Sequence, residues 1–433
     1  MVEHDQIVCL CHSCKLLKPV VMARTRRYGA AVNGSTTQRT ERSVIAFLAF
    51  IGILMAFGVD AALPAFDELS ESFDLEARNL SPAITGTVYF VGMALGQVVY
   101  GVLGDRFGRR PILLIGIGVY ALGALVSAIA PNLEVLLAAR FVWGLGASAP
   151  TVLRMAIARD LFDGDRMARV VSTVAAVFLL GPIIVPIAGE GILLVGSWRL
   201  VFGAALVLAS IAFVWTLRFG ETLADEHRRT LRFGPFVEAL EAVVRTSSTR
   251  WSILSMAFFT GSFFVWLGSA QVILDQVYDR DSQFTIFFGL SGVGMAIALM
   301  SNGRLIDRFG IRYLAVRASV AFVVVAAIGT IAAVAADGVP SLWVWFGWAC
   351  VANALNMILG PMSSAIAMEP MGDKAGMASA LLGLTQLGGG AILAAIVDAR
   401  IDATVTPMVV GALVYGAAGL GCMVLAVRSP VTD

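Results

Sequence analysis

A charged decapeptide that occurs twice constrains the fold of this chain more than any other feature. The first copy is Gly101-Val-Leu-Gly-Asp-Arg-Phe-Gly-Arg-Arg110 and the second is Gly303-Arg-Leu-Ile-Asp-Arg-Phe-Gly-Ile-Arg312. Seven of the ten positions are identical, and the copies begin 202 residues apart in a chain of 433 residues. Each copy follows one long apolar run and precedes another. A charged turn repeated at about half the chain length indicates two related halves.

The composition places these halves in a membrane. The chain is 58% hydrophobic and only 14% charged, whereas soluble domains carry about 25% charged residues. The formal net charge of +1 gives no bulk attraction to nucleic acid. We therefore expect an all-α protein that crosses the bilayer many times.

Twelve apolar runs approach the ~20 residues that a spanning helix needs. We place them at 43–64, 82–103, 111–130, 133–157, 168–195, 199–218, 251–274, 284–306, 312–335, 341–367, 375–398 and 404–427. The predicted architecture is two pseudo-symmetric six-helix bundles, 43–218 and 251–428. A tail (1–42), a central loop (219–250) and a short C-terminal tail (429–433) complete the chain. Residues 236–244 have helical apolar spacing and are expected to lie along the membrane surface.

The loops alternate in charge, and this predicts the orientation. The two decapeptides and the central loop lie on a basic side, together with Arg159, Arg166 and Arg169. The opposite, acidic side carries Asp67, Glu68, Glu71, Asp74 and Glu76. Because short cytoplasmic loops are enriched in Lys and Arg, both termini are predicted to be cytoplasmic.

A cysteine–histidine cluster near the N-terminus is the one candidate metal site. Cys9, Cys11, His12 and Cys14 are ligand types that zinc prefers, but the usual second ligand pair is missing. We predict no metal here. A start codon placed too far upstream, with Met22 as the true start, is the favoured explanation of this segment. The tail also lacks the features of a secretory signal.

Two six-helix halves, each with a G-x-x-x-D-R-x-G-x-R turn after its second helix, resemble the major facilitator superfamily. The first turn matches the signature of that family at Gly101, Asp105, Arg106, Gly108, Arg109 and Arg110. The resemblance implies a conformational latch that also includes Asp307, Arg308 and Arg312. Gly101 would permit a close helix crossing, while the charged residues would pair across the seam between the halves.

Further motifs resemble the drug:proton antiporters of the family, in particular the bicyclomycin/chloramphenicol-resistance (Bcr/CflA) branch. Arg140-Phe-Val-Trp-Gly-Leu-Gly-Ala147 is similar to the buried-arginine motif, and Asp60-Ala-Ala-Leu-Pro64 to the D-x-x-L-P element. The antiporter motif corresponds to Gly181, Pro182, Pro186 and Gly189. The branch is indicated by 197–202, 221–223, 367–370 and 375–383. Glu190 departs from the pattern, since a second glycine is usual there, and this puts the tight packing of the segment in doubt.

Ionisable groups inside spanning helices cost ~2.5–3.5 kcal/mol on insertion scales, so they are candidates for function. Asp60, Arg140, Arg154 and Glu190 qualify in the first half, whereas the spans of the second half are almost free of such groups. A carboxylate held between desolvation and a nearby arginine can release and regain a proton. Asp60, Arg140 and Glu190 are therefore predicted to couple transport to protons, with Arg140 pairing to Asp60 or Glu190. The alternatives are a helix-end aspartate in water, a structural arginine pair, and a snorkelling Arg154.

The predicted function is the export of amphipathic, drug-like molecules, such as chloramphenicol- or bicyclomycin-type antibiotics, in exchange for protons. A single chain in a bacterial inner membrane would work by alternating access, powered by the proton gradient without a cofactor. The alternatives are an exporter of one metabolite and a transporter-like receptor. An enzyme is not expected, because P-loop and nucleophile-elbow motifs are missing. The side chains expected in the substrate cavity are Phe57, Tyr89, Trp143, Ala147, Thr151, Trp266, Gln271, Asn353, Asn356 and Gln386.

Overall fold

The computed structural model describes residues 40–178, 180–224, 226, 234–280, 283–401 and 403–429. Met1–Val44 and Ile45–Asp433 are separate units, and the helical assembly belongs almost entirely to the second. The cysteine–histidine cluster and Met22 lie outside the described residues.

All regular structure in these ranges is helical, as predicted. The first half contains α2 (Glu41–Asp60), η1 (Leu63–Ala65), α3 (Phe66–Phe73), α4 (Ile84–Phe107), α5 (Arg109–Ala128), α6 (Leu133–Leu161), α7 (Gly164–Phe178), α8 (Gly181–Leu193) and α9 (Trp198–Phe219). The central loop contributes α10 (Gly234–Arg245). The second half contains α11 (Ser247–Gln276), α12 (Phe284–Phe309), α13 (Ile311–Ala335), α14 (Leu342–Met368), η4 (Glu369–Lys374), α15 (Ala375–Leu384), η5 (Thr385–Gly389), α16 (Gly390–Asp398) and α17 (Thr406–Arg428).

Eleven spans in the described ranges are long and apolar enough to cross a membrane, one fewer than predicted. The predicted span 168–195 is described as two helices, α7 and α8, on either side of residue 179, which lies outside the described residues. Two prolines follow this position, Pro182 at the start of α8 and Pro186 inside it. Proline lacks the N–H that would continue the hydrogen-bond ladder of the preceding turn.

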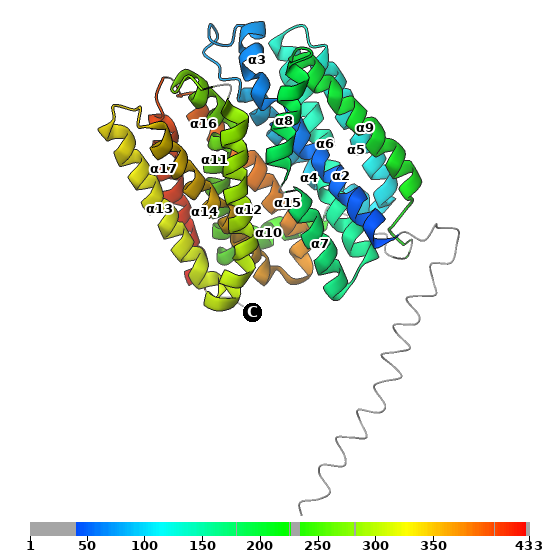
Figure 1. Ribbon diagram of the computed structural model, residues 1–433. Coiled ribbons are helices and arrows are strands. Elements are labelled where there is room, and N and C mark those ends of the chain that lie inside the picture. Colours follow the sequence, from blue (N-terminus) through cyan, green and yellow to red (C-terminus); the bar gives the residue numbers. More distant parts are fainter. Residues whose placement is uncertain are drawn as a thin grey trace, which may run out of the picture. The chain divides into compact units, whose positions relative to one another are not determined.

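Helices pack mainly within their own half of the chain. In the N-half, which we define as α2–α9, α6 packs between α4 and α5, and α9 packs on α5. In the C-half, defined as α11–α17, α14 and α17 both pack on α11 and α13, and Figure 1 shows this group together. The halves meet where α4 runs along α15, η5 and α16, and where α8 contacts α12.

Small residues set the spacing between α4 and α6. A Cβ atom added to Gly92 would overlap the carbonyl of Phe141, and one added to Gly144 would overlap the carbonyl of Tyr89. Glycines at such contacts let two membrane helices approach until their backbones touch. This contact holds Arg140, one turn before Gly144, against the start of α4.

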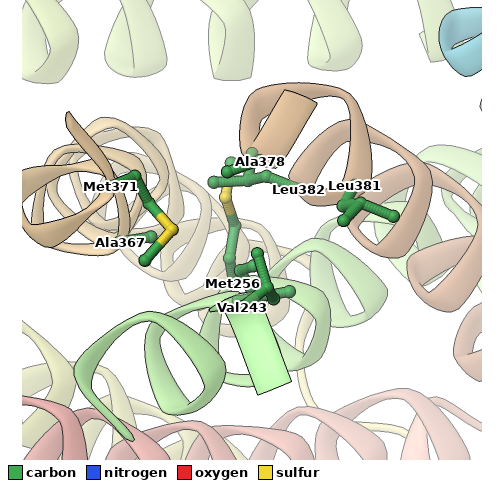
Figure 2. Close-up of a cluster of buried hydrophobic side chains, with 8 residues drawn as sticks. Val243, Met256, Ala367, Met371, Ala378, Leu381 and Leu382 are labelled. Carbon is green, nitrogen blue, oxygen red and sulfur yellow. The ribbon is translucent and has the colours of Figure 1, made fainter. Parts of the chain in front are cut away.

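The helix of the central loop packs against protein, which differs from the predicted position along the membrane surface. Val243 of α10 is buried in an apolar cluster with residues of α11, α14, η4 and α15. Figure 2 shows Met256 extending from α11 toward Ala378 of α15, with Val243 beside it. The remaining cluster members are Ile253, Ala367, Met371, Leu381 and Leu382. The apolar stripe of α10 therefore covers the basic end of the C-half.

The predicted span 375–398 is interrupted by a π-helical turn, η5, between α15 and α16. Three consecutive glycines, Gly388–Gly390, lie at this turn. A Cβ atom on Gly390 would lie 2.8 Å from the Cγ2 atom of Thr260 on α11, so this part of the helix approaches α11 closely. Single π-turns occur frequently at functional sites.

Candidate coupling and substrate site

Arg140 is the most deeply buried charged side chain of the site, with 1% of its surface exposed. It lies on α6, which begins after Asn132, whose side chain accepts a hydrogen bond from the Val135 N–H. The guanidinium donates to the carbonyl of Gly58 at 2.7 Å and to that of Thr85 at 3.2 Å. Gly58 lies in the last turn of α2, where helix carbonyls lack intrahelical partners. Arg140 therefore ties the end of α2 to the start of α4.

Three aromatic rings complete the surroundings of this guanidinium. Its central carbon lies 5.0 Å from the ring centroids of Tyr89 and Trp143 and 5.3 Å from that of Phe202. Cation–π attraction of this kind stabilises a desolvated arginine. Among the described residues no ion pair joins Arg140 to Asp60 or Glu190, so carbonyls and rings replace the predicted carboxylate partner.

Asp60 is the last residue of α2 and is 7% exposed. It is not a helix-end aspartate projecting into water, because little of its surface is exposed and Tyr89 of α4 lies against Gly58, two residues earlier. A Cβ atom on Gly189 would overlap the carbonyl of Ala61, which shows that α8 packs tightly here in spite of the neighbouring Glu190. The described residues provide neither an ion pair nor a hydrogen bond to the Asp60 carboxylate.

Glu190 contacts the other half of the chain. It is exposed, and its Oε2 accepts a hydrogen bond from the Thr285 hydroxyl of α12 at 2.6 Å. Asp67 of α3 makes a second link of the same kind, accepting from Gln271 Nε2 of α11 at 2.9 and 3.0 Å. Both links join the halves on the acidic side.

A pocket lies between the halves, next to these links. Phe90 of α4 and Phe264 of α11 face it as a stacked pair, with ring centroids 4.1 Å apart. Arg140 and Asp398 also line it. The other lining residues are apolar or small: Val59, Leu63, Phe66, Ala83, Gly86, Thr87, Leu267, Gly268, Ala391 and Ala394. The lining is mostly apolar with few polar groups, as at small-molecule sites, but the cavity volume is only about 20 Å³. The pocket is therefore closed in this state and has to widen before it can hold a drug-sized ligand.

Asp398 is the residue of the site that the sequence analysis missed. It is 4% exposed, and its Oδ1 accepts a hydrogen bond from the Ser269 hydroxyl at 2.6 Å. It ends α16 in the same way that Asp60 ends α2. Asp398 is the last residue of the predicted span 375–398, so a carboxylate at the end of an apolar run was the signal that could have found it.

The predicted cavity residues occupy other positions. Tyr89 and Trp143 pack around Arg140, while Trp266 stacks on Phe288 and contacts the tilted ring of Trp345 inside the C-half. Gln271 contacts Asp67. The others do not line this pocket; they are Phe57, Ala147, Asn353 and Asn356, which are buried, and Thr151 and Gln386, which are half-buried. The guanidinium of Arg154 lies over the ring of Phe178 at 4.9 Å, between helices.

The first decapeptide forms a charged cluster within the N-half. Arg109 pairs with Asp105 at 2.5 Å and with Asp160 at 2.9 Å. The backbone N–H groups of Arg109 and Arg110 donate to Glu221, which thereby caps α5 with a negative charge. The described ion pairs of this turn therefore stay inside one half and do not cross the seam as predicted.

The second decapeptide repeats part of this arrangement. Arg110 donates to the carbonyl of Leu217 near the end of α9, and Arg312 donates to that of Val427 near the end of α17. Arg312 also pairs with Glu369 at 2.8 Å. Arg106 and Arg308 each lie over the ring of the following phenylalanine, at 5.1 and 5.2 Å. Asp307 is exposed.

The glycines of the two turns have distinct roles. Gly108 follows the end of α4 and Gly310 follows the end of α12, with φ of +102° and +78°. These angles lie in a backbone region that favours glycine. At Gly101, by contrast, a Cβ atom would make only an ordinary contact, 3.7 Å from Val152 Cγ1. The predicted close crossing at Gly101 is therefore wrong.

Membrane-length helices in two groups, with an apolar pocket between them, define a multi-pass membrane transporter. Residues 48–395 match the family described as Major Facilitator Superfamily, and the chain belongs to this family. It is 31% identical over 396 residues to "Uncharacterized MFS-type transporter YdgK" of Bacillus subtilis (strain 168), covering 88% of this chain and 94% of that protein.

Two further comparisons agree with this assignment. The chain is 30% identical over 374 residues to the "Bicyclomycin resistance protein homolog" of Haemophilus influenzae (strain ATCC 51907 / DSM 11121 / KW20 / Rd), covering 85% of this chain and 92% of that protein. Its fold is similar to that in a crystal structure of a D-xylose-proton symporter, with a TM-score of 0.71 and 16% identity, covering 90% of this chain and 98% of that one.

Proposed function

We propose that this protein exports amphipathic, drug-like small molecules, such as bicyclomycin- or chloramphenicol-type antibiotics, in exchange for protons. It works as a single chain in a bacterial inner membrane, with both termini in the cytoplasm and without a cofactor. The observation that carries this proposal is the pocket between the halves, where apolar and aromatic side chains surround only two charged groups. The name of the Haemophilus influenzae relative supports the antibiotic class.

The proposed coupling centre is Asp60 together with Arg140. The carboxylate is nearly inaccessible, and the neighbouring guanidinium is already satisfied by carbonyls and rings. Asp60 is therefore free to lose its proton when the site opens to water and to regain it when the site closes. Glu190 acts beside it as a closing contact between α8 and α12.

Alternating access then consists of rocking of the two halves about the pocket. The hydrogen bonds from Gln271 to Asp67 and from Thr285 to Glu190 close the acidic side in the present state. Their breakage would open the pocket toward that side. The proton gradient supplies the free energy for the cycle.

Inverted membrane vesicles with an imposed proton gradient test the proposal. A pH-sensitive dye reports proton release while chloramphenicol, bicyclomycin and cationic dyes are added in turn. We expect the drugs to dissipate the gradient with the wild-type protein and not with Asp60→Asn. A matched control is Asp74→Asn, an exposed acidic-side carboxylate with φ of 49°, a backbone region that asparagine adopts readily.

Two other results would redirect the proposal. If Asp60→Asn behaves as wild type, coupling does not depend on Asp60, and Glu190 and Asp398 are the next carboxylates to replace. If no compound moves protons with the wild-type protein, drug export is wrong, and an exporter of one endogenous metabolite becomes the leading function.

A further inference from the structure

Asp398 is a buried carboxylate that is not part of the proposed coupling centre of Asp60 and Arg140. It lies on α16 in the C-half, lines the inter-half pocket and has one described hydrogen-bond donor, Ser269. A buried ionised carboxylate is expensive unless a cation or several donors compensate its charge. A single hydroxyl is a weak compensation, so the geometry favours a bound proton.

The ionisable groups around Asp398 are engaged elsewhere or distant along their helices. Arg140, across the pocket on α6, donates to two carbonyls. Arg400, which follows α16, donates to the carbonyl of Ile396, and Tyr415 of α17 donates to that of Leu393. The described part of the chain contains no ion pair to Asp398.

The helices packed against α16 bring few other charges. On α11, Asp275 lies six residues beyond Ser269, or ~9 Å along the axis, and Arg250 is at the other end. On α4 the charged side chains, Asp105 and Arg106, belong to the basic turn. The described side chains of η5 and α15 are uncharged.

The space around the carboxylate is small. A Cβ atom added to Gly268 of α11 would lie 3.0 Å from Asp398 Oδ2 and 2.9 Å from the Cβ atom of Ala83 at the start of α4. Oδ1 is occupied by the Ser269 hydroxyl. Oδ2 therefore lies beside the close contact between Gly268 and Ala83, where there is room for a proton.

Because Ala83 belongs to the N-half, the burial of Asp398 depends on the contact between the halves. We propose that Asp398, held by Ser269, is a second proton-binding group of the transporter, located on the C-half and sealed by Ala83. This proposal rests on proton-coupled transport and adds a carrier to it. It also corrects the prediction that ionisable groups inside the spans belong almost entirely to the first half.

The proposed step is a simple proton transfer. When the halves separate on the acidic side, Ala83 moves away, water reaches Oδ2, and the O–H bond breaks with the proton passing to water. When the halves close, Oδ2 takes a proton from water and the neutral carboxyl is buried again. Ser269 remains bonded in both states, since a neutral or an ionised carboxyl oxygen accepts its O–H.

Infrared difference spectroscopy of the purified protein between acid and alkaline buffer tests proton binding without any drug. A protonated carboxyl has a C=O stretching band that the carboxylate lacks. We expect Asp398→Asn to lose one such band, while Asp60→Asn loses another. The matched control is Asp337→Asn, because Asp337 is exposed on the same half and has φ of 48°, which asparagine tolerates.

An unchanged carboxyl band in a folded Asp398→Asn protein would overturn the proposal. If that variant fails to fold, Ser269→Ala keeps the acid and removes the donor that favours its ionised form. The band should then persist to higher pH than in wild type, and an unmoved transition would count against the site.

A transport measurement distinguishes failure of this proposal from failure of the proposed function. In proteoliposomes exporting chloramphenicol, proton flux per exported molecule should fall about twofold in Asp398→Asn, since one of two carriers is lost. If the wild type moves no drug while the Asp398 band is present, the proposed function fails and the proton site stands. If transport works with an unchanged proton flux and an unchanged band, the proton site fails alone.

Discussion

Arg140 keeps its charge inside the membrane through the planar shape of its guanidinium. Two N–H groups reach two carbonyls on different helices, while the faces of the group contact three rings. A lysine would carry the same charge, but its ammonium lacks the planar fork and the stacking surface. We expect Arg140→Lys to lower the free energy of unfolding by about 1–3 kcal/mol, because a buried carbonyl loses its donor.

Thermal unfolding of the purified protein measures this loss. The control is Arg78→Lys, since Arg78 makes an exposed ion pair with Glu134 at 2.9 Å, and such pairs contribute about 0–1 kcal/mol. Equal small shifts for the two variants would mean that charge alone, and not the geometry of the fork, matters at Arg140.

The glycines of the first decapeptide provide a second residue-scale prediction. Gly108→Ala should destabilise the protein by about 1–3 kcal/mol, because φ of +102° is a strained backbone for alanine. The added Cβ atom would also overlap the carboxylate of Glu221. Gly101→Ala should be close to neutral, and the melting temperatures of the two variants compare them directly. A larger loss at Gly101 would restore the close helix crossing predicted there.

At this scale the sequence predicted which residue types matter better than it predicted their partners. Arg140, Asp60 and Glu190 were found because charges are rare in apolar runs. Their contacts depend on where α2 ends and on how α8 meets α12, and neither is encoded in local spacing. Residue types do not show which backbone carbonyl, such as that of Gly58, lies near a side chain. A carboxylate was therefore the only partner of Arg140 that the sequence could suggest.

Among the elements, α10 was predicted correctly as a helix, but the surface against which its apolar stripe packs was not. The apolar spacing of 236–244 predicts an amphipathic helix, but a membrane surface and the base of a bundle satisfy the same stripe equally well. We expect Val243→Asp to detach α10, because Val243 is 8% exposed and belongs to the buried cluster that includes Met256 and Met371. Faster proteolysis of the central loop in membranes would report the detachment.

The neighbouring residue is the matched control for this prediction. Val244 is 53% exposed, so Val244→Asp introduces the same charge without entering the cluster. Its cleavage rate should stay at that of wild type. If both variants were cleaved at the same increased rate, the effect would come from charge on the helix and not from loss of packing.

The predicted spans and the observed helices differ in where the elements begin and end, and these differences have physical causes. Long apolar runs located eleven of the spans, since length and hydropathy alone decide whether a helix can cross a bilayer. They could not predict the π-turn η5, where glycine changes the backbone inside an apolar run. The pocket is lined by α16, the helix that follows this turn, and by Leu63 of η1.

For the whole molecule, the pairs that join the halves on the acidic side determine how readily the pocket opens there. Asp67 accepts two hydrogen bonds from Gln271, and hydrogen bonds to a charged group contribute about 1.5–3 kcal/mol. Since 1.4 kcal/mol corresponds to a factor of ten, Asp67→Ala should raise the population open on that side by about tenfold or more.

Labelling of a pocket residue measures this shift in population. In a background with the five native cysteines replaced by alanine, Leu267→Cys places a thiol in the pocket wall, where a membrane-impermeant maleimide reaches it only after opening. We expect Asp67→Ala to accelerate labelling about tenfold, because the link between α3 and α11 is lost while the pocket itself is intact. Arg78→Ala is the control, since it breaks an exposed acidic-side ion pair within the N-half. Equal acceleration by both variants would show general loosening of that side, and no acceleration by either would mean that Asp67 and Gln271 do not hold the halves together.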